Sequence, residues 1–440
     1  MPVTVATALI TPAPRTSGWG PPGRARRGRR LPRWGTLAIV SAAGGHRSVV
    51  DHRAAIAGLL GEGEVARIAL DRRAAGRRLA AELVGADDLP RFDNSAMDGY
   101  AVCPGTPDQR SYPVVGDVPA GAAPAFFLAP GEAARVMTGA RVPEGTFAVV
   151  PVERTDASPT GPAPERVAVD GDPTPGQHVR PRGEDATAGS VLARRGSAIT
   201  PALIALGRSA GCTTVEVHVP TRVAVIATGA ELAPPDADPG LGGIHESNSD
   251  MVAALAEGAR CEVHRVEVCS DEPDELRHLL EALDTDPAVD LVITTGGVSA
   301  GAYEVVRQVC EPLPTFDFVH LEMQPGGPQG LGCFGSTPVV CLPGTPVGAF
   351  VAFEVLVRPA LDRRHGAPPA QPGHAAYRGK PRRTRAGRVQ FVTSVLHDDG
   401  TVTAPDARHL TALAAANCLI EVPLGVDQLI DGDVVTVHLL

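Results

Sequence analysis

Aromatic residues are scarce in this sequence: phenylalanine, tryptophan and tyrosine together make up 4% of its 440 residues. Apolar residues as a whole still reach 43%, so we expect hydrophobic cores built from alanine, valine and leucine. The sequence also lacks any run of about 18 consecutive apolar residues, which excludes a membrane-spanning helix and argues against a membrane partner. The formal net charge is −10, which argues against a broad nucleic-acid-binding surface.

Cysteine motifs are absent as well. No two of the eight cysteines have CxxC spacing, and no histidine cluster accompanies them, which argues against a zinc site or a disulfide framework. Several cysteines stand inside apolar runs, such as Cys341 in VVCLPG, as is typical of small buried hydrophobic residues. We therefore expect a reducing compartment and predict a cytoplasmic protein.

The first 47 residues combine the arginine-rich run RARRGRRLPR with a short apolar stretch, TLAIVSAA. An export signal has this order, but the apolar stretch begins only at Thr36 and no convincing cleavage site follows it. We favour a disordered extension over residues 1–47, or a start codon placed too early. The sequence leaves the true start site open.

Segments of different periodicity follow one another from Ser48 onward. Helical spacing is predicted for SVVDHRAAIAGLL, for EVARIALDRRAAGRRLAAELV and for ITPALIALGRSAG. Between them, residues 89–175 consist of short β-like runs separated by proline and glycine, which predicts a separate β-rich module. At the other end, a proline- and alanine-rich linker (367–376) precedes β-like runs that suggest a small barrel or sandwich.

Residues 221–362 alternate between apolar strands and amphipathic helices. The strand-like runs include RVAVIATG, DLVITTGG and TPVVCLPG, and one intervening helix has Asp271 placed as a candidate N-cap with Pro273 in its first turn. Near-continuous apolar strands separated by helices predict a doubly wound, mostly parallel α/β sheet with helices on both faces.

Three of these strands end in glycine, at ATG (227–229), TTGG (294–297) and LPG (342–344). Ligands of open parallel sheets bind outside the carboxyl ends of the strands, where glycine lets backbone amides come close to an anion. Simple turn glycines are the alternative, but three such turns at one edge favour an anion or nucleotide-like site. None matches GxxxxGK[ST] or GxGxxG, so an ordinary P-loop or dinucleotide fingerprint is excluded.

Acidic residues stand beside glycine turns at four places: Glu231, Glu304, Asp98 and Asp185. A carboxylate next to an anion site makes physical sense when a cation such as Mg²⁺ lies between them. A solvated surface role is the alternative for each acid. The loop NSAMDGYAV (94–102) could hold a polar heterocycle or a ribose through its polar side chains, or these could simply form an Asx-turn.

Seven segments of the chain resemble the MoeA family of molybdopterin molybdenumtransferases, to which the E domains of gephyrin and plant Cnx proteins are related. They are LPRFDNSAMDGYAV (89–102), RVMTGARVPEGTFAVVPVE (135–153), VRPRGEDATAG (179–189), VIATGAEL (225–232), ITTGGVSAG (293–301), QPGGPQG (324–330) and LPGTPVGAF (342–350). The order of NSAMDGYAV, MTGA and RGED is the most specific part, and the resemblance runs from about Ser48 to the C-terminus.

The resemblance implies four domains. They are a discontinuous helical and extended domain (48–88 and 176–217), an inserted β-rich domain (89–175), a doubly wound molybdopterin-binding domain (218–365) and a C-terminal β-barrel (377–440). It also implies a homodimer whose active site lies across the interface. The implied reaction converts adenylyl-molybdopterin and molybdate to molybdenum cofactor and AMP, with Mg²⁺.

Site residues follow from the same resemblance. It implies catalytic roles for Asp98, Asp185, Glu231 and Glu304, with Glu231 and Glu304 also holding the metal. The implied positions for binding the pterin nucleotide are Asn94, Ser95, Thr138, Gly229, Ser247, Asn248, Asp271, Gly296, Gly297, Ser299, Pro325, Gly326, Pro343, Gly344 and Pro346.

The chain departs from the family pattern in ways that bear on molybdate. Many members read PGKP where this chain has glycine at Gly327, and GDYD where it reads GAYE, so Ala302 removes an acid and Glu304 replaces an aspartate. The C-terminal region lacks a GSH-type loop, and its nearest match is DARHLTAL (406–413). Two alternatives therefore stay open, a paralogue that binds pterin or nucleotide without inserting metal and a non-enzymatic scaffold, as does the choice of molybdate or tungstate.

Overall fold

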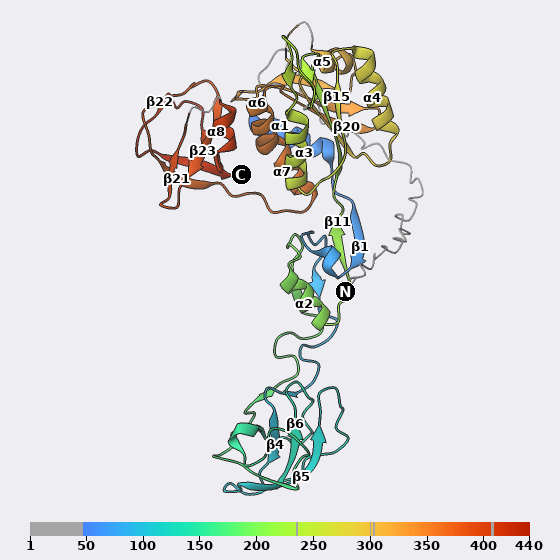
Figure 1. Ribbon diagram of the computed structural model, residues 1–440, viewed down its shortest axis with the longest axis vertical. Coiled ribbons are helices and arrows are strands. Elements are labelled where there is room, and N and C mark those ends of the chain that lie inside the picture. The colour runs from blue at the N-terminus through green and yellow to red at the C-terminus, as the bar shows by residue number, and fades with distance from the viewer. Residues whose placement is uncertain (1–46, 235, 300, 302–303, 406–408) are drawn as a thin grey trace, which may run out of the picture. The chain divides into compact units, whose positions relative to one another are not determined.

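The computed structural model describes residues 47–234, 236–299, 301, 304–405 and 409–440 (Figure 1). Apart from Arg47, the N-terminal extension expected over residues 1–47 lies outside the described residues. Ala302 and the 406–408 part of DARHLTAL also lie outside them. Within the described ranges, every helix is too short or too polar to cross a membrane.

The segment after the first helix contradicts one prediction. Helix α1 (Val49–Leu60) forms as expected, with the Ser48 hydroxyl accepting from the Asp51 amide at 3.1 Å. Residues 64–84, however, do not form an α-helix: β1 (Val65–Ala69) pairs antiparallel with β11 (Thr214–His218) and is followed by the short 3-10 helix η1 (Arg72–Ala74). The alanine- and arginine-rich composition favours a helix, but pairing with a distant strand overrides this local preference.

Short elements complete this part of the chain. Strand β2 (Leu83–Val84) pairs with β10 (Val191–Ala193). The predicted helix at ITPALIALGRSAG is confirmed as α2 (Pro201–Ser209), whose N-cap Thr200 accepts from the Leu203 amide at 3.1 Å. A small core that includes Leu70, Leu79 and Val217 joins these elements.

The prediction of a β-rich fold is confirmed by a five-stranded sheet with the order β7-β4-β6-β5-β8, whose strands lie within residues 89–175. Its strands are β4 (Gly99–Cys103), β5 (Ser111–Val118), β6 (Glu132–Val136), β7 (Ala148–Pro151) and β8 (Arg166–Ala168), with the turn η2 (Val152–Arg154) after β7. Two of the chain's few aromatics, Tyr100 and Tyr112, are fully buried in it. Beside it, β3 (Asn94–Ser95) pairs with β9 (Val179–Arg180).

The predicted doubly wound domain contains a six-stranded sheet with the order β15-β12-β16-β20-β19-β17. The strands are β15 (Glu262–Cys269), β12 (Arg222–Thr228), β16 (Leu291–Thr295), β20 (Thr337–Leu342), β19 (Pro328–Phe334) and β17 (Asp317–His320). The first four strands pair in parallel, and β19 pairs antiparallel with both β20 and β17, so the prediction of a mostly parallel sheet is confirmed. Glycine-rich β19 is a strand that the sequence pattern did not reveal.

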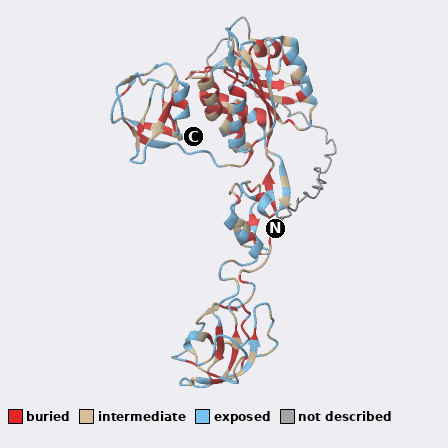
Figure 2. Cartoon of the chain, in the orientation of Figure 1, coloured by how far each residue is buried: buried red, intermediate tan, exposed pale blue. Residues whose placement is uncertain are grey.

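Helices cover both faces of this sheet (Figure 1). One face packs against α1, α3 (Asn248–Gly258) and a continuous run of α6 (Pro346–Ala352), the π-helical η3 (Phe353–Val357) and α7 (Arg358–Arg364). The other face packs against α4 (Pro273–Thr285) and α5 (Val305–Cys310). Alternate residues of β12 therefore enter different cores, and the central strands β12, β16 and β20 consist mostly of buried residues, which Figure 2 colours red.

The C-terminal region is a closed barrel, in agreement with one of the two predicted forms. Its strands are β21 (Gly373–Tyr377), β23 (Val389–Leu396), β24 (Thr401–Thr403), β25 (Cys418–Val422) and β27 (Val434–Leu439). Pairing of β23 with β25 closes the ring. Short flanking elements are β22 (Arg382–Arg383), β26 (Gln428–Leu429), β18 (Met323–Gln324) and α8 (Leu410–Ala414).

Candidate active site

Three glycine turns meet at the carboxyl edge of the parallel sheet. In the register of the central strands, Ala227 lies beside Thr295, and Thr295 lies beside Leu342. The turns also touch: a Cβ at Gly296 would lie 2.5 Å from the Thr228 carbonyl oxygen, and one at Gly344 would lie 3.2 Å from the Gly296 Cα. Glycine is therefore required at Gly296, whose φ of 94° also disfavours a side chain.

Asn248, at the start of α3, ties two of these turns together. Its side-chain amide donates to the Gly344 carbonyl at 2.6 Å and to the Thr295 hydroxyl at 3.1 Å, and that hydroxyl donates to the Pro343 carbonyl at 2.9 Å. Asn248 is only 8% exposed and Thr295 only 1%. The edge is thus a fixed frame of buried polar groups.

Two buried acceptors in this frame have no hydrogen-bond partner among the described residues: the Asn248 Oδ1 and the Thr228 Oγ1. The Thr228 hydroxyl lies beneath the diglycine turn, 2.9 Å from where a Cβ of Gly296 would be and 3.1 Å from that of Gly297. A buried polar atom without a partner is costly and indicates a ligand, ion or water at that place. The sequence did not single out Thr228, although its position just before Gly229 was a usable signal.

The N-terminus of α3 is held by an acidic residue that sequence reasoning missed. The Glu246 carboxylate accepts from the amides of Asn248 at 2.6 Å and Ser249 at 2.9 Å, and also from the Ser249 hydroxyl. Glu246 thereby satisfies helix amides that would otherwise have no acceptor and fixes the side chain of Asn248. The predicted site residue Ser247 makes no capping bond and lies exposed at this helix end.

The two predicted metal-holding acids stand next to the glycine turns. Glu304, at the N-terminus of α5, accepts from the Ser299 amide at 2.9 Å, which closes the loop after TTGG. Glu231 is exposed, with its carboxylate folded over Gly229 so that a Cβ there would lie 2.6 Å from an oxygen.

Asp271 does not cap α4 as predicted. The N-cap position belongs to Glu272, and the Asp271 carboxylate instead accepts from the Ala230 amide at 3.1 Å. This bond crosses from the end of β15 to the turn after β12. Asp271 therefore holds the turn that contains Glu231 in place. The position of Asp271 just before α4 in the sequence does not reveal this role.

The donor set at this edge is compatible with magnesium. Among the described residues no three His, Cys, Asp or Glu side chains gather to form a protein-only metal cage. Mg²⁺ does not need one, because it usually takes one or two carboxylates and completes its shell with water and substrate phosphate oxygens. Glu231 and Glu304 supply that number of carboxylates beside turns suited to phosphate.

The QPGG turn (324–327) and the start of α6 contain further predicted binding residues and lie against each other. A Cβ at Gly326 would lie 3.2 Å from the Gly348 carbonyl oxygen, so the turn that includes Pro325 packs against α6, which begins at Pro346. Gly327 is buried, and a Cβ there would lie 2.7 Å from the His320 Nε2. The His320 imidazole thus occupies the space into which a side chain at this position would extend.

The NSAMDGY loop brings together a second set of predicted residues in the β-rich module. The Asp98 carboxylate accepts from the Thr138 amide at 2.6 Å and from the Thr138 hydroxyl at 2.8 Å. These two bonds hold the pKa of Asp98 below its usual range, although the side chain is exposed. Asp98 is therefore a carboxylate fixed in one orientation and open to solvent.

The neighbouring predicted residues have mainly structural partners. The Ser95 hydroxyl donates to the Met97 carbonyl at 2.5 Å and accepts from the Met97 amide at 3.2 Å, which is the local turn that the sequence left open as an alternative. Asn94 lies opposite Arg180 in the β3–β9 pair. Exposed Asp185 accepts from the Arg180 guanidinium at 3.1 Å, so its loop is joined to that pair.

Comparisons with known proteins cover nearly the whole described chain. Family models match in order: the MoeA N-terminal region (domain I and II) at residues 47–211, the probable molybdopterin binding domain at 224–363 and the MoeA C-terminal region (domain IV) at 376–440.

Curated relatives and solved structures agree. Molybdopterin molybdenumtransferase 2 of Mycobacterium tuberculosis is 39% identical over 403 residues, which is 88% of this chain and 98% of the relative. Molybdopterin molybdenumtransferase 1 of the same organism is 33% identical, covering 90% and 99%. The crystal structure of a MoeA molybdopterin biosynthesis protein from Pyrococcus horikoshii superposes with a TM-score of 0.76 at 26% identity, covering 90% of this chain and 99% of that one.

Proposed function

Since the chain belongs to the MoeA family, we propose that it is a molybdopterin molybdenumtransferase, which converts adenylyl-molybdopterin and molybdate to molybdenum cofactor and AMP. The observation that carries this proposal is the sheet edge. Three glycine turns lie there with two buried acceptors that have no partner among the described residues, and Glu231 and Glu304 follow two of the turns in sequence, which suits a ligand with both phosphate and polar ring groups.

Each part of the edge has a role in this reaction. The glycine turns bring backbone amides close enough to bind the pyrophosphate, while Asn248 and Thr228 offer acceptors to donor groups of the substrate. Glu231 and Glu304 would hold Mg²⁺, which when bound neutralises charge that develops on the phosphates. Glu304 is kept in place by the Ser299 amide, and Asp271 orients the Glu231 turn.

The proposal includes a homodimer. As the family resemblance implies, Asp98 and Thr138 of one subunit would complete the sheet-edge site of the other and position the substrate. Mixing two impaired variants tests this. Asp98→Asn and Glu304→Gln subunits, unfolded together and refolded, should regain activity, because a mixed dimer contains one intact site. Activity no higher than that of the separate variants would contradict the shared site.

The direct test is release of AMP from adenylyl-molybdopterin by purified protein supplied with Mg²⁺. We expect release to require molybdate and to fall to background when Mg²⁺ is chelated. AMP release that ignores molybdate would instead indicate a hydrolase. We also propose that the protein works in the cytoplasm, which is supported by its eight free thiols.

The glycine at position 327 allows a test of the alternative function, in which the chain is a paralogue that inserts metal weakly. A lysine at this position, as in many family members, would clash with the His320 ring. Gly327→Lys alone should therefore lower activity. Combining Gly327→Lys with His320→Gly makes room for the side chain. If the natural chain is limited by weak molybdate binding, the double variant should have a lower KM for molybdate than His320→Gly alone. An unchanged KM would contradict that limit.

A further inference from the structure

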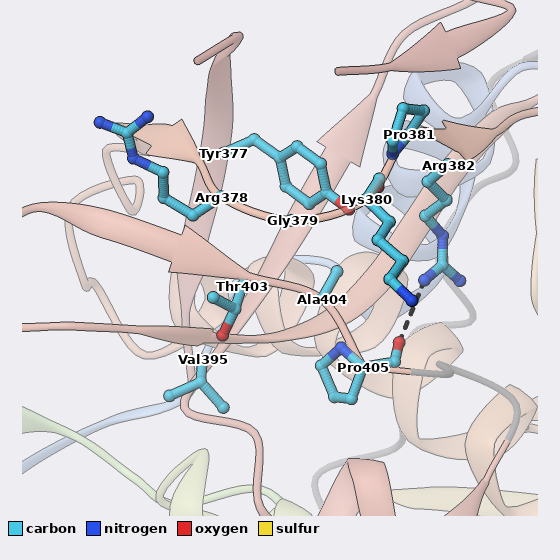
Figure 3. A pocket seen from close by; sticks show the side chains of 10 residues that line it. All are labelled: Tyr377, Arg378, Gly379, Lys380, Pro381, Arg382, Val395, Thr403, Ala404 and Pro405. Atoms are coloured by element: carbon cyan, nitrogen blue, oxygen red, sulfur yellow. Dashed lines mark hydrogen bonds between the residues drawn. The ribbon is translucent and has the colours of Figure 1, made fainter. Parts of the chain in front are cut away.

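A pocket of about 680 Å³ opens on the C-terminal barrel, apart from the residues assigned to the reaction (Figure 3). Three basic side chains line it, Arg378, Lys380 and Arg382, in the segment that follows β21. Its size lies in the range typical of small-molecule sites, roughly 300–1,000 Å³. A pocket of this size with cations at its rim is suited to a small anionic ligand.

The basic character of this segment is unusual for the chain. Residues 378–388 read RGKPRRTRAGR, with six cationic and no acidic residues, whereas the whole chain has a net charge of −10. Lys380 is the only lysine in the sequence, so every other cation of the 40 is an arginine. Positive charge is therefore concentrated locally, which attracts anions to this face of the barrel.

Neighbouring residues hold this segment in a defined shape. The Tyr377 hydroxyl donates to the Lys380 carbonyl at 3.0 Å, and Arg382 lies opposite Leu429 in the β22–β26 pair. The backbone around the lysine is thus fixed on both sides. A fixed backbone lowers the entropic cost of binding, because the cations are already near their bound positions.

The three cations differ in how far they are already engaged. Arg378 forms an ion pair with Asp431 at 3.0 Å, and in Figure 3 its side chain points away from Lys380. One N–H of the Arg382 guanidinium donates to the Pro405 carbonyl oxygen at 3.0 Å. This bond orients the guanidinium and leaves its other N–H groups available. Among the described residues the Lys380 ammonium has no hydrogen bond or ion pair. Lys380 and Arg382 are therefore the pair open to an anion.

The opposite side of the pocket is largely apolar. Val395, Ala404 and Pro405 line it, together with the Thr403 side chain. A bare inorganic anion would use only the cationic rim, whereas a phosphate that carries an apolar or planar group would use both sides. An ammonium and a guanidinium that line the same pocket are groups that commonly bind phosphate.

We propose that this pocket binds a small phosphate monoester, with its phosphate on Lys380 and Arg382 and its apolar or planar part against Val395, Ala404 and Pro405. The site is separate from the sheet edge, and the proposal does not depend on the reaction proposed above. A nucleoside monophosphate is one source of this chemistry. A tetrahedral dianion such as molybdate shares only the charged part.

The single lysine provides a direct probe. Pyridoxal 5′-phosphate is a planar phosphate monoester whose aldehyde forms an imine with a lysine amine and releases water; borohydride then reduces the imine to a stable secondary amine. Peptide mass spectrometry of the full chain reads labelling at Lys380 separately from the N-terminal amine. We expect saturable labelling at Lys380 that is about tenfold more efficient than with pyridoxal, which lacks the phosphate.

A matched pair of variants tests the phosphate contact. Arg382→Ala should reduce labelling of Lys380 by about five- to tenfold, because a charge-assisted contact is lost. Arg383→Ala removes an equal charge from the adjacent exposed position and should change labelling less than twofold, as expected for a screened surface charge. Equal thermal unfolding midpoints for both variants would show that the barrel is intact.

Competition separates the possible ligands. AMP should protect Lys380 at lower concentrations than inorganic phosphate or molybdate. Equal labelling by pyridoxal and pyridoxal 5′-phosphate would overturn the proposal. So would protection by molybdate and phosphate but not by AMP, since the apolar wall would then have no role. Protection only by an acidic peptide would likewise replace the small-molecule site with a protein-binding one.

Discussion

The sheet edge and the NSAMDGY loop present their polar groups in opposite ways. At the edge, Thr228 and Asn248 keep buried oxygens for which the described part of the chain offers no partner, and the turns contribute mostly backbone. In the loop, the Asp98 carboxylate is already satisfied by both donors of Thr138. The edge is therefore incomplete until a ligand arrives, whereas the loop is organised beforehand, and the two should respond differently to substitution.

Of the substitutions considered, Glu304→Gln at the sheet edge is expected to lower activity most. It keeps the shape and the bond from the Ser299 amide but removes the charge that would hold the metal. Molybdate-dependent AMP release should fall at least about 100-fold. Glu311→Gln is the matched control, since Glu311 lies at the end of the same helix and forms an ion pair with Arg307. A similar loss in both variants would remove Glu304 from the reaction.

Asp98→Asn tests the loop. The amide oxygen of asparagine can still accept from Thr138, so the loop should keep its conformation while the charge is lost. We expect kcat/KM to fall about tenfold with no change in the unfolding midpoint. Asp93→Asn, which leaves the bond from the Arg182 amide possible, is the control. Wild-type kinetics for Asp98→Asn would make its carboxylate a purely structural group.

Thr228→Val separates ligand binding from stability at the edge. The hydroxyl has no partner within the ranges that the structure describes, so replacing it by a methyl group should leave the free energy of unfolding unchanged or raise it by up to about 1 kcal/mol. The KM for adenylyl-molybdopterin should rise about fivefold if the substrate uses this oxygen. Thr295→Val is the contrast, since its hydroxyl bonds Asn248 and Pro343 and its loss should destabilise by about 1–2 kcal/mol. Equal destabilisation of both variants would show that Thr228 is satisfied.

Thr138→Val should give the smallest effect, visible only in the pH profile. Both Thr138 donors lower the pKa of Asp98, so the carboxylate stays ionised to lower pH than an ordinary aspartate. Removing the hydroxyl should raise that pKa, and the acid limb of the kcat/KM profile should move to higher pH. An unmoved acid limb would mean that a different group controls it.

The two regions differ in how much of their structure could be predicted from the sequence. The strands of the sheet were predictable because residues such as Val223–Ile226 are apolar without interruption, as burial on both faces requires. The glycine turns were also predictable, because each one stands at the end of a predicted strand. Thr228 and Glu246 were not predictable, because their importance depends on which hydrogen bonds the tertiary structure leaves open or closes.

The misassigned segments have a similar cause. Residues 64–84 have helical composition, yet β1 pairs with β11, which is about 150 residues away in sequence and invisible to local patterns. Asp271 has the sequence position of a helix cap but bonds Ala230 on a neighbouring turn. The family resemblance pointed to Asp98 and Thr138 separately, and the structure shows that they form one unit.

Two cysteines near the ends of sheet strands, Cys269 in β15 and Cys341 in β20, have a last consequence for the proposed transfer of molybdenum to a dithiolene. Burial raises the pKa of Cys269 to about 11 and that of Cys341 to about 12. At neutral pH both therefore remain protonated, and a protonated thiol is a poor nucleophile and a poor metal ligand. In the proposed reaction these two thiols therefore compete poorly with the substrate's sulfur pair for the metal.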